Sequence, residues 1–540
     1  MEIAVAALSA GAGAIFCAKF GTHFVTERKK HIRGETLRRA AGHCLPAFAG
    51  VFVFASADVS SAVGPPPSSL ASAQEISLDK ALNRALAHNR NLVLQGHQVR
   101  QAELGIKGAE AGFAVRLLPD SSAGLTGSGN NWQYGLTAAK PFITGTELSL
   151  GGNYQSQTYS LGNITNATVS GGTITAQISQ PLFRNFGTLV NGEPLVRAHQ
   201  GLKSALRHYE QQKDSLILDV IANYEGILQL QRQIESDEAL SDRTERLFRL
   251  TQAKERLARA TRVDSLRVES QRGAASARLA SSRDRLDFTR RNFAEQLGDP
   301  PTTEYRLKPS IELQVEPPSL ADAVTIALSN RLDYAQAIQD RQDAERATRI
   351  AQRGLYPALN LISRYSSLVG GGNTLSGRDE DWFIGVAASS SFNPAAERVS
   401  IAQARQGEEA AKDVVEISAL SIAREVQQAI GTYRAAQAEL GIQQRNQQIA
   451  EARVRLAQRM FEAGKGDNFT VTDAEAALAD SQSQLLDARS TAHVAAYRLV
   501  LALGTLSEHP EDLRPAHARD EGTAYIESLR AANGDNPKTK

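Results

Sequence analysis

The residue types that carry out covalent or metal chemistry are present in this sequence, but not at the spacings that such chemistry requires. Its ten histidines are scattered, and the sequence has no His-Glu-x-x-His pair, no paired-cysteine motif and no phosphate-binding Gly-x-x-x-x-Gly-Lys-Ser/Thr loop. A Gly-x-Ser-x-Gly nucleophile elbow is also missing. The sequence therefore predicts no catalytic residue, no metal site and no cofactor, and it favours a protein that is not an enzyme.

Composition and charge argue against two further classes of protein. The chain has 60 basic and 59 acidic residues, which leaves no basic excess for a nucleic-acid surface. Charged residues make up 22% of the chain, and no long uninterrupted apolar run occurs beyond the N-terminus, which argues against a polytopic helical membrane protein. Both cysteines, Cys17 and Cys44, precede Ala57, so a chain cleaved there would contain none.

The N-terminal stretch has the order of an export signal. A basic segment, an apolar stretch and the small residues Ala55-Ser56-Ala57 follow one another. This order predicts a signal peptide over residues 1–57, with residues 1–24 as an upstream extension and cleavage after Ala57 or Ala62. The alternative is an N-terminal membrane anchor, against which the shortness of the apolar stretch counts. Residues 58–75 are expected to form a flexible leader.

The placement of proline predicts two very long helical hairpins. Residues 195–299 and 395–509 contain no proline and are rich in residues that favour helix. Each span has one soft interruption, at Ala260-Thr261-Arg262-Val263 in the first and from Ala463 to Asn468 in the second. An arm of about 65 residues, at about 1.5 Å per residue, would be roughly 100 Å long, which is more than a compact domain needs.

Apolar residues recur every seven positions in both spans, which places them on one seam of a supercoiled helix and predicts close helix packing. The two series are Ala435, Ile442, Ile449 and Leu456, and Val220, Ile227 and Ile234. A cytosolic coiled coil would show the same spacing, but the export signal counts against it.

Short segments between the helical spans alternate apolar and polar residues. The apolar sides are Leu148, Leu150, Gly152 and Tyr154; Ile174, Ala176 and Ile178; Leu359, Leu361, Ser363 and Tyr365; and Trp382, Ile384, Val386 and Ala388. Such alternation, with loops rich in Gly, Asn and Ser, is typical of transmembrane β-barrel strands, although water-exposed sandwich strands share it. The strands are too few to close a barrel alone, so the pattern predicts an oligomer.

The two halves of the chain resemble each other, which indicates an internal duplication. Ser77–Leu86 is similar to Ser319–Leu328, and each is followed by an X-Pro break, strand-like sequence and a proline-free hairpin. The predicted first repeat covers 76–300, with strands at about 121–183 and a hairpin at 193–298. A Pro-rich linker at 301–318 joins it to the second repeat at 319–507, which has strands at about 357–392 and a hairpin at 396–504. A polar, disordered tail is predicted at 508–540.

Taken together, residues 76–507 resemble the TolC family of outer-membrane efflux proteins. Two further segments carry the resemblance: Ser179-Gln180-Pro181-Leu182-Phe183 after the first strands and Ala502–Leu506 at the end of the second hairpin. Two segments depart from it: Ser391-Phe392-Asn393-Pro394 and the additional strand-like residues 140–146. The resemblance implies a mainly α fold with a membrane β-barrel portion. Duplicated long hairpins would form a periplasmic α-barrel tunnel, and each protomer of a homotrimer would give four strands to a twelve-stranded outer-membrane barrel.

The same resemblance implies a function without covalent chemistry. The chain is expected to be a passive conduit in the outer membrane, with its tunnel in the periplasm, in a tripartite efflux or type I secretion system. Its partners would be outer-membrane lipid, a periplasmic adaptor (membrane fusion protein) and an inner-membrane transporter of the RND, ABC or MFS type, with no nucleic acid. The alternative is a non-channel periplasmic coiled-coil structural or adaptor protein, which should lack the alternating strands and the duplication.

The resemblance also assigns residues to the tip of the tunnel, where the adaptor would dock. The expected contact residues are Phe461, Gly464, Lys465 and Gly466 at the second turn and Thr261, Arg262 and Val263 at the first.

Two tip positions, Thr470 and Asp473, match places where the family often carries acidic residues that narrow the channel. Three Asp473 carboxylates around a narrow axis would repel one another and attract a cation. The alternative for Asp473 is an ordinary carboxylate at a helix start, favoured there by the helix dipole. Asp264 of the first half is expected to be a helix N-cap rather than part of a gate.

Overall fold

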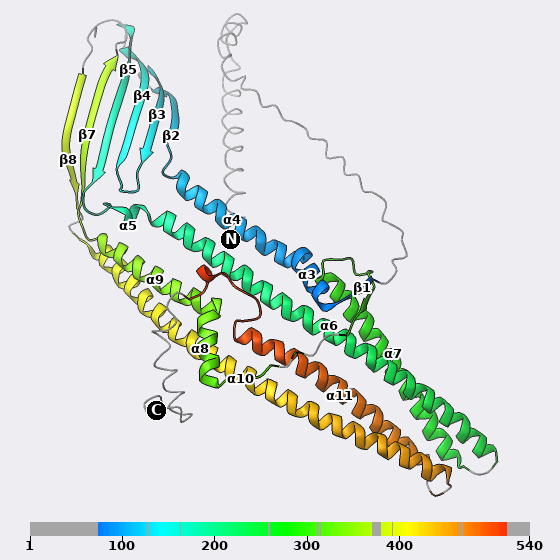
Figure 1. Ribbon diagram of the computed structural model, residues 1–540. Coiled ribbons are helices and arrows are strands. Elements are labelled where there is room, and N and C mark those ends of the chain that lie inside the picture. The colour runs from blue at the N-terminus through cyan, green and yellow to red at the C-terminus, as the bar shows by residue number, and fades with distance from the viewer. Residues whose placement is uncertain are drawn as a thin grey trace, which may run out of the picture. The chain divides into compact units, whose positions relative to one another are not determined.

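The computed structural model describes residues 74–126, 129–161, 164–257, 260–309, 313, 315–369, 380–390, 393–463, 465 and 468–515 (Figure 1). The predicted signal peptide, the leader as far as residue 73, Gly464, Gly466 and the tail from residue 516 lie outside these residues.

The same order of elements occurs twice along the chain. The first half contains β1 (Gln74–Ile76), α3 (Leu78–His88), α4 (Arg90–Ala111), β2 (Arg116–Thr126), β3 (Gly129–Pro141), β4 (Glu147–Leu161), β5 (Ile164–Pro181), α5 (Thr188–Asn191), α6 (Glu193–Arg256) and α7 (Arg262–Gln296). The second half contains β6 (Tyr305–Leu307), α8 (Leu320–Asn330), α9 (Leu332–Arg353), β7 (Ala358–Val369), β8 (Glu380–Ser389), α10 (Ala395–Glu462), α11 (Asn468–Ala502) and the 3-10 turn η1 (Glu511–Leu513). Strands β1 and β6 join the halves as a small parallel sheet.

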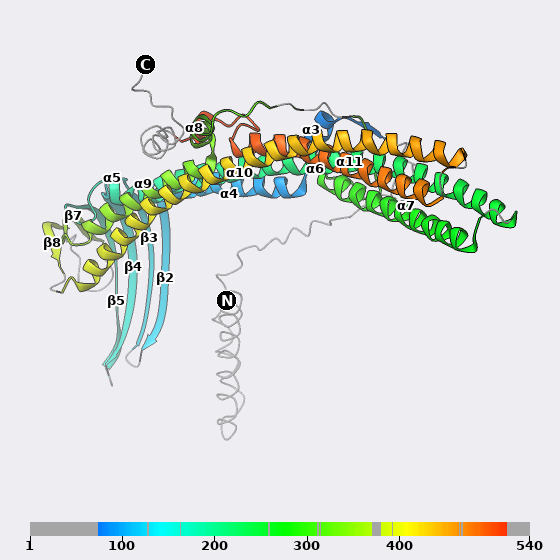
Figure 2. The ribbon, with the colours of Figure 1, turned by 90° about the horizontal axis from the view of Figure 1, so that it is seen from below.

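The long helices confirm the predicted mainly α fold with a sheet portion. Helix α6 has 64 residues and α10 has 68, and each folds back on a shorter partner, α7 or α11 (Figures 1 and 2). Pro194 lies at the start of α6, where a missing N–H costs no helical hydrogen bond. Among the described helices, none combines the length and the apolar character needed to cross a membrane.

The expected number of strands is wrong for this chain. Among the described residues, the large sheet contains six strands, in the order β2-β3-β4-β5-β7-β8, instead of the four that the resemblance implied. Every neighbouring pair is antiparallel, and the additional hairpin comes from the first half, which supplies four strands where the second supplies two. Pro119 lies inside β2, where an edge position tolerates its missing N–H.

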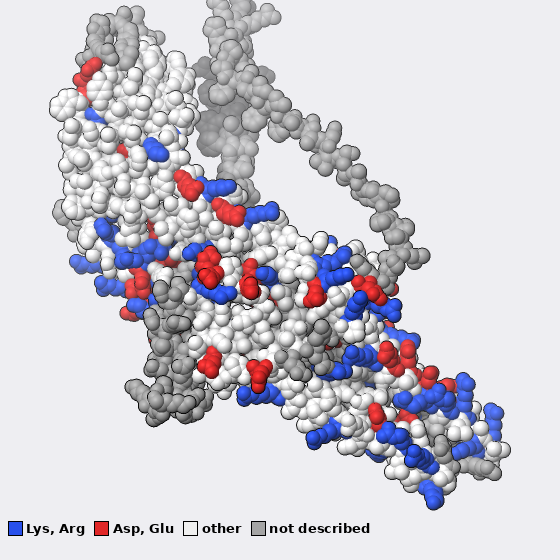
Figure 3. Space-filling view, viewed as in Figure 1, with Lys and Arg blue, Asp and Glu red and all other residues white. Residues whose placement is uncertain are grey.

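The register of the sheet confirms that the alternating residues share one face. Leu150 lies opposite Ala176, Ala176 opposite Tyr365 and Tyr365 opposite Trp382, so the apolar sides of β4, β5, β7 and β8 are continuous. Apolar side chains on this face are exposed within the chain, and Figure 3 shows few charged side chains on the visible side of the sheet. An exposed apolar face of this extent is suited to lipid.

Two apolar clusters, one in each half, fix the short helices against the long ones. The first includes Val220, Tyr224, Ile227, Phe293 and Leu297, and the second includes Val324, Leu328, Ile422, Val426 and Leu499.

Only one of the two predicted seams is buried. Val220 and Ile227 are buried and Ile234 packs against them, whereas Ile442, Ile449 and Leu456 are 53%, 66% and 61% exposed and Ala435 is exposed too. Helix α10 instead turns Ala450, Val454 and Ala457 towards α11. The packing predicted for the α10 seam is therefore wrong within one chain, because sevenfold spacing does not identify the partner surface.

Each long hairpin is followed by a glycine at the equivalent position of the two repeats. Gly298 and Gly504 have φ values of +81° and +69°, which only glycine adopts without strain. A Cβ atom on Gly298 would lie 2.4 Å from the backbone oxygen of His88, between α3 and α4. On Gly504 it would lie 3.2 Å from the backbone nitrogen of Arg331, between α8 and α9.

Gly298→Ala is expected to lower the free energy of unfolding by about 2–4 kcal/mol, because it combines a positive φ with an overlap against backbone. Thermal unfolding of the detergent-solubilised protein measures this effect. The matched control is Gly226→Ala in α6, where an added Cβ meets nothing within 4 Å and a small stabilisation is expected. Equal melting temperatures for the two variants would contradict the argument.

The start of the polar tail is ordered, contrary to the prediction of disorder from residue 508. The Nε2 atom of His509 lies 3.1 Å from Asp214 on α6 and its Nδ1 atom lies 3.8 Å from Glu210, while Arg207 donates a hydrogen bond of 3.0 Å to the backbone oxygen of Leu513. The contact with Asp214 and the nearby carboxylate of Glu210 raise the pKa of the buried His509 imidazole to about 9.

We expect this segment to be docked most firmly from mildly acidic to neutral pH, where the imidazole is charged and its carboxylate partners are ionised. A raised pKa means that the charged imidazole contributes fully below its ordinary value near 6.5, and that this contribution, at most about 3 kcal/mol, is lost as pH rises through about 9. Limited proteolysis by chymotrypsin after the buried Leu513 should accelerate between pH 8 and pH 10. The step should be missing in His509→Gln, and persistence of the step in that variant would assign it to another group.

Candidate functional site: channel tip and sheet junction

The ends of α6 and α10 and the starts of α7 and α11 lie together, far from the sheet (Figure 1). Phe461, the predicted tip aromatic near the end of α10, is covered by the ammonium of Lys254 on α6, 3.7 Å from the ring centroid. On the other side of the turn, Arg267 of α7 lies 5.4 Å from the ring of Phe469 on α11. Each aromatic residue beside the second turn therefore meets a cation from the first hairpin, an attractive contact.

A largely buried ion pair joins the hairpins deeper in the tip. The Nε atom of Arg243 on α6 lies 2.5 Å from Oε2 of Glu475 on α11, and the two side chains are 27% and 9% exposed. Gln458 of α10 donates a hydrogen bond of 2.9 Å to the other oxygen of Glu475. The pair borders a cavity of about 790 Å³ that is lined by residues of α6, α7, α10 and α11.

Further polar contacts continue along the line where α11 meets the first hairpin. Arg278 of α7 bridges Asp237 of α6, at 2.9 Å, and Asp480 of α11, at 3.0 Å. Ser236 donates a hydrogen bond of 2.7 Å to Gln482, and the buried His493 lies 3.1 Å from Glu225. The hairpins are thus held together by separate polar contacts and by a small apolar cluster of Leu240, Ala275 and Ala479.

Thr470 and Asp473 are the third and sixth residues of α11. Asp473 forms an ion pair with Arg453 of α10, and both side chains are about half exposed. Helix α11 has no acidic residue in its first turn, so the reading of Asp473 as a carboxylate at a helix start is wrong. The structure adds a basic partner for Asp473 that the sequence did not reveal.

The first turn begins α7 with a complete capping box. Thr261 is the N-cap, and its hydroxyl accepts a hydrogen bond of 3.2 Å from the backbone N–H of Asp264, whose carboxylate in turn accepts one of 2.9 Å from the Thr261 backbone. Asp264 is therefore the N3 residue and not the predicted N-cap. Val263 is 63% exposed, and Arg262 is 3.6 Å from Glu255 at the end of α6. Lys465 is exposed as well.

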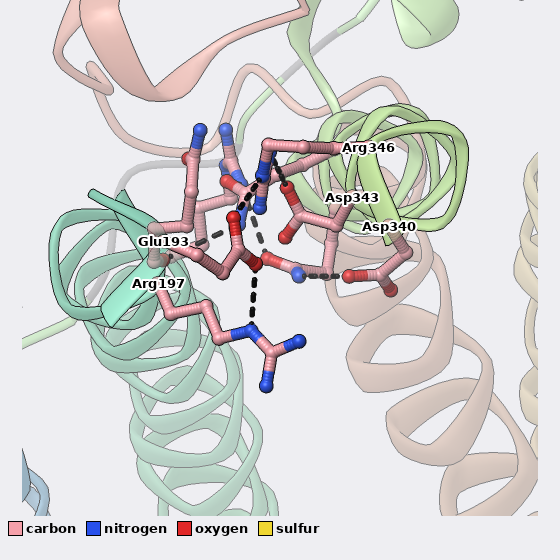
Figure 4. Close-up of polar contacts among 9 residues, drawn as sticks. Glu193, Arg197, Asp340, Asp343 and Arg346 are labelled. Atoms are coloured by element: carbon pink, nitrogen blue, oxygen red, sulfur yellow. Dashed lines mark hydrogen bonds and ion pairs between the residues drawn. The ribbon is translucent and has the colours of Figure 1, made fainter. Parts of the chain in front are cut away.

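A second charged cluster fixes the opposite end of α6, where the helix leaves the sheet (Figure 4). The buried Glu193 accepts hydrogen bonds of 2.7 Å from both Arg346 of α9 and Arg197 of α6, and Arg346 also lies 2.8 Å from Asp343. Burial opposes ionisation of Glu193, but the hydrogen bonds from Arg346 and Arg197 outweigh it and lower its pKa below the usual value. The carboxylate also lies at the helix N-terminus, where the dipole favours negative charge.

Within the described residues, no group of three or more His, Cys, Asp and Glu side chains is arranged to hold a metal ion. The residues that link the hairpins, among them Arg243, Arg278 and Glu475, escaped the sequence reasoning. Their partners lie more than 200 positions away, and no local motif marks them.

A sheet with one apolar face, joined to duplicated hairpins about 100 Å long, defines the class of outer-membrane channels with a helical tunnel. Residues 323–505 match the family described as outer membrane efflux protein. Over these residues, which belong to the second repeat, the match confirms the resemblance to outer-membrane efflux proteins, and it agrees with the predicted location in the outer membrane. No curated protein matches the sequence closely enough to count as a relative.

Solved structures with the same fold cover most of the chain. The outer membrane protein VceC from Vibrio cholerae has a TM-score of 0.61 at 17% identity, and the match covers 79% of this chain and 96% of that one. The Campylobacter jejuni CmeC outer membrane channel has a TM-score of 0.63 at 11% identity, with coverages of 81% and 87%. The open state of the Neisseria gonorrhoeae MtrE outer membrane channel has a TM-score of 0.59 at 16% identity, and the match covers 80% of this chain and 89% of that one.

Proposed function

We propose that the chain is the outer-membrane channel of a tripartite efflux or type I secretion system, a passive homotrimeric conduit without covalent chemistry. The observation that carries this proposal is the joining of a lipid-suited sheet face to very long, mostly polar helical hairpins in one chain. Residues 76–300 and 319–507 would be the two repeats, linked by 301–318. The match to the outer membrane efflux family supports the coarser statement of an efflux channel.

The exposed α10 seam supports a homotrimer. Ile442, Ile449 and Leu456 are more than half exposed and lie on one side of a supercoiled helix. Such a stripe would be poorly solvated in a single chain, and a neighbouring copy of the chain supplies the missing cover. The sheet edges β2 and β8 also need a partner strand, because an edge strand presents backbone N–H and C=O groups for pairing.

The tip supports docking of a periplasmic adaptor and an inner-membrane transporter. Lys465 and Val263 are exposed beside the two turns, and Arg262 is more than half exposed. These residues, with Phe461, Thr261, Gly464 and Gly466, form the proposed adaptor surface.

Opening of the tip would separate α10 and α11 from the first hairpin. The contacts that must break are those of Arg243 with Glu475, Arg278 with Asp480 and Lys254 with Phe461. An adaptor that binds the separated state better would therefore shift the equilibrium towards an open channel.

The proposal is tested by the mass and the bilayer conductance of the purified mature protein. A detergent-solubilised trimer with small conductance that cations reduce supports a conduit closed at its tip. A monomer without conductance would favour the alternative, a periplasmic structural or adaptor protein whose strands do not form a shared barrel.

A further inference from the structure

We propose that three copies of the sheet close into an eighteen-stranded barrel whose bore matches the width of the helical tunnel, with β2 of each copy paired to β8 of the next. The inference rests on the proposed homotrimer and concerns the two strands per chain that the family resemblance did not predict. Because each chain supplies six strands, three copies supply eighteen.

The first support is that the apolar face extends without a break over all six strands. Trp132, Tyr134 and Leu136 of β3 lie opposite Ser156, Tyr154 and Gly152 of β4, on the face that carries Leu148 and Leu150. On β2, the residues of this face are Leu117, Pro119, Ser121, Ala123 and Leu125. Leu117 and Leu125 are 66% and 90% exposed, so β2 presents apolar side chains like the other strands. A hairpin folded into a watery lumen would have no use for such a face.

Aromatic residues support the same placement at the outer end of the sheet. Trp132 and Tyr134 of β3 pack edge to face with centroids 5.5 Å apart, and Tyr134 lies opposite Tyr154 of β4. Tyr365 of β7 lies opposite Trp382 of β8. Aromatic girdles are a mark of strands that meet lipid headgroups, and this one includes the additional strand β3.

The second support is a match of widths where the helices meet the sheet. Four long helices adjoin it: α4 leads to β2, β5 leads through the short α5 to α6, α9 leads to β7 and β8 leads to α10. Helices pack about 8–10 Å apart, so four of them occupy roughly 32–40 Å of circumference. Strands about 4.8 Å apart and tilted by about 40° take up roughly 6.3 Å each, so six strands need ~38 Å, which lies within the width that the four helices occupy.

The third support is the direction of the two open edges. Six antiparallel strands in one sheet leave β2 and β8 running in opposite directions. A head-to-tail ring of copies therefore continues the antiparallel pattern, and no edge remains in lipid.

The consequence is a wide outer opening. With the same strand spacing and tilt, eighteen strands give a backbone diameter of about 36 Å, about 1.5-fold that of twelve strands. The barrel then imposes no narrower limit on cargo than the helical tunnel, which leaves the tip as the place where passage is controlled.

Disulfide trapping across the subunit boundary tests the proposal. Ser122 of β2 and the odd-numbered residues of β8 from Asp381 to Ser389 lie on the polar face of the sheet. Each double variant combines Ser122→Cys with a cysteine at one of these β8 positions. The chain cleaved after Ala57 has no cysteine of its own, so the background is clean. Oxidation of the trimer is expected to convert most chains of at least one pair into covalent dimers and trimers.

The matched control uses Gln155→Cys in β4 in place of Ser122→Cys. Both residues lie opposite Gln133 of β3, so they share one level and one face of the sheet. Trapping of β4 to β8 in an intact trimer would show a twelve-stranded barrel that excludes β2 and β3, and would overturn the proposal while leaving the channel function in place. A trimer that no β2 pair traps would overturn it as well. A protein that is monomeric in detergent would refute the homotrimer itself.

Discussion

Arg243→Ala should raise the conductance of the purified channel about tenfold or more in planar bilayers. The substitution removes one partner of a pair in which Glu475 is only 9% exposed, and it leaves that carboxylate with Gln458 alone. Breaking a buried pair by removing one partner costs several kcal/mol, and on the order of 1–3 kcal/mol is reasonable here because Arg243 is partly exposed. The loss is repeated in each copy of a trimer and weakens only the state in which the hairpins are in contact.

A matched arginine is available as a control. Arg249 lies six residues further along α6 and pairs at 2.8 Å with Glu245 on the same helix, so Arg249→Ala removes a charge without separating the hairpins. It should leave the conductance near that of the unaltered protein. Reversing the pair, with Arg243→Glu and Glu475→Arg together, should restore low conductance. Equal conductance for Arg243→Ala and Arg249→Ala would count against a role for this pair in closure.

The second large effect is expected in the block of current by divalent cations. Asp473 is paired with Arg453, so the charges of a ring of three such residues are largely offset by their own neighbours. Arg453→Ala would leave three unpaired carboxylates and should strengthen the block by divalent cations about tenfold. Asp473→Ala would leave three unpaired arginines and should abolish it.

The opposite signs of these two effects make the prediction specific. Single-channel recording with Mg²⁺ on the side of the tip measures the blocking concentration for each variant. Arg455→Ala is the control, because Arg455 lies on the same helix and pairs with Glu451 within it, at 3.7 Å. A block that is the same in all three variants would mean that Asp473 does not face the path of the ions.

The fold could be predicted from the sequence where a single periodic signal determines it. The absence of proline over more than a hundred residues predicted each of the two hairpins. The alternation of apolar and polar residues identified the strand faces in β4, β5, β7 and β8. Residues 140–146, predicted to be additional strand-like sequence, are mostly a turn, because β3 ends at Pro141 and β4 begins at Glu147, and the additional strand residues precede them.

The contacts within the site could not be predicted in the same way. Val220 and Ile449 follow the same sevenfold rule, yet the first is fully buried and the second is 66% exposed. The rule gives a face, and only the tertiary arrangement decides what covers it. The pairing of Arg243 with Glu475 likewise depends on two hairpins meeting, and charged residues are so frequent on both that sequence alone leaves many equivalent pairings.

The unbroken length of α6 has a mechanical consequence. The helix runs from the Glu193 anchor beside the sheet to Arg256 at the tip, so one rod carries load between the membrane end and the docking end. An untwisting of ~10° shared among its 64 residues amounts to only ~0.2° each, far inside the ±15–20° scatter of ordinary helical dihedrals. The helix can thus act as a torsion spring that rotates its free end while the clamped end, and the sheet beside it, stays still.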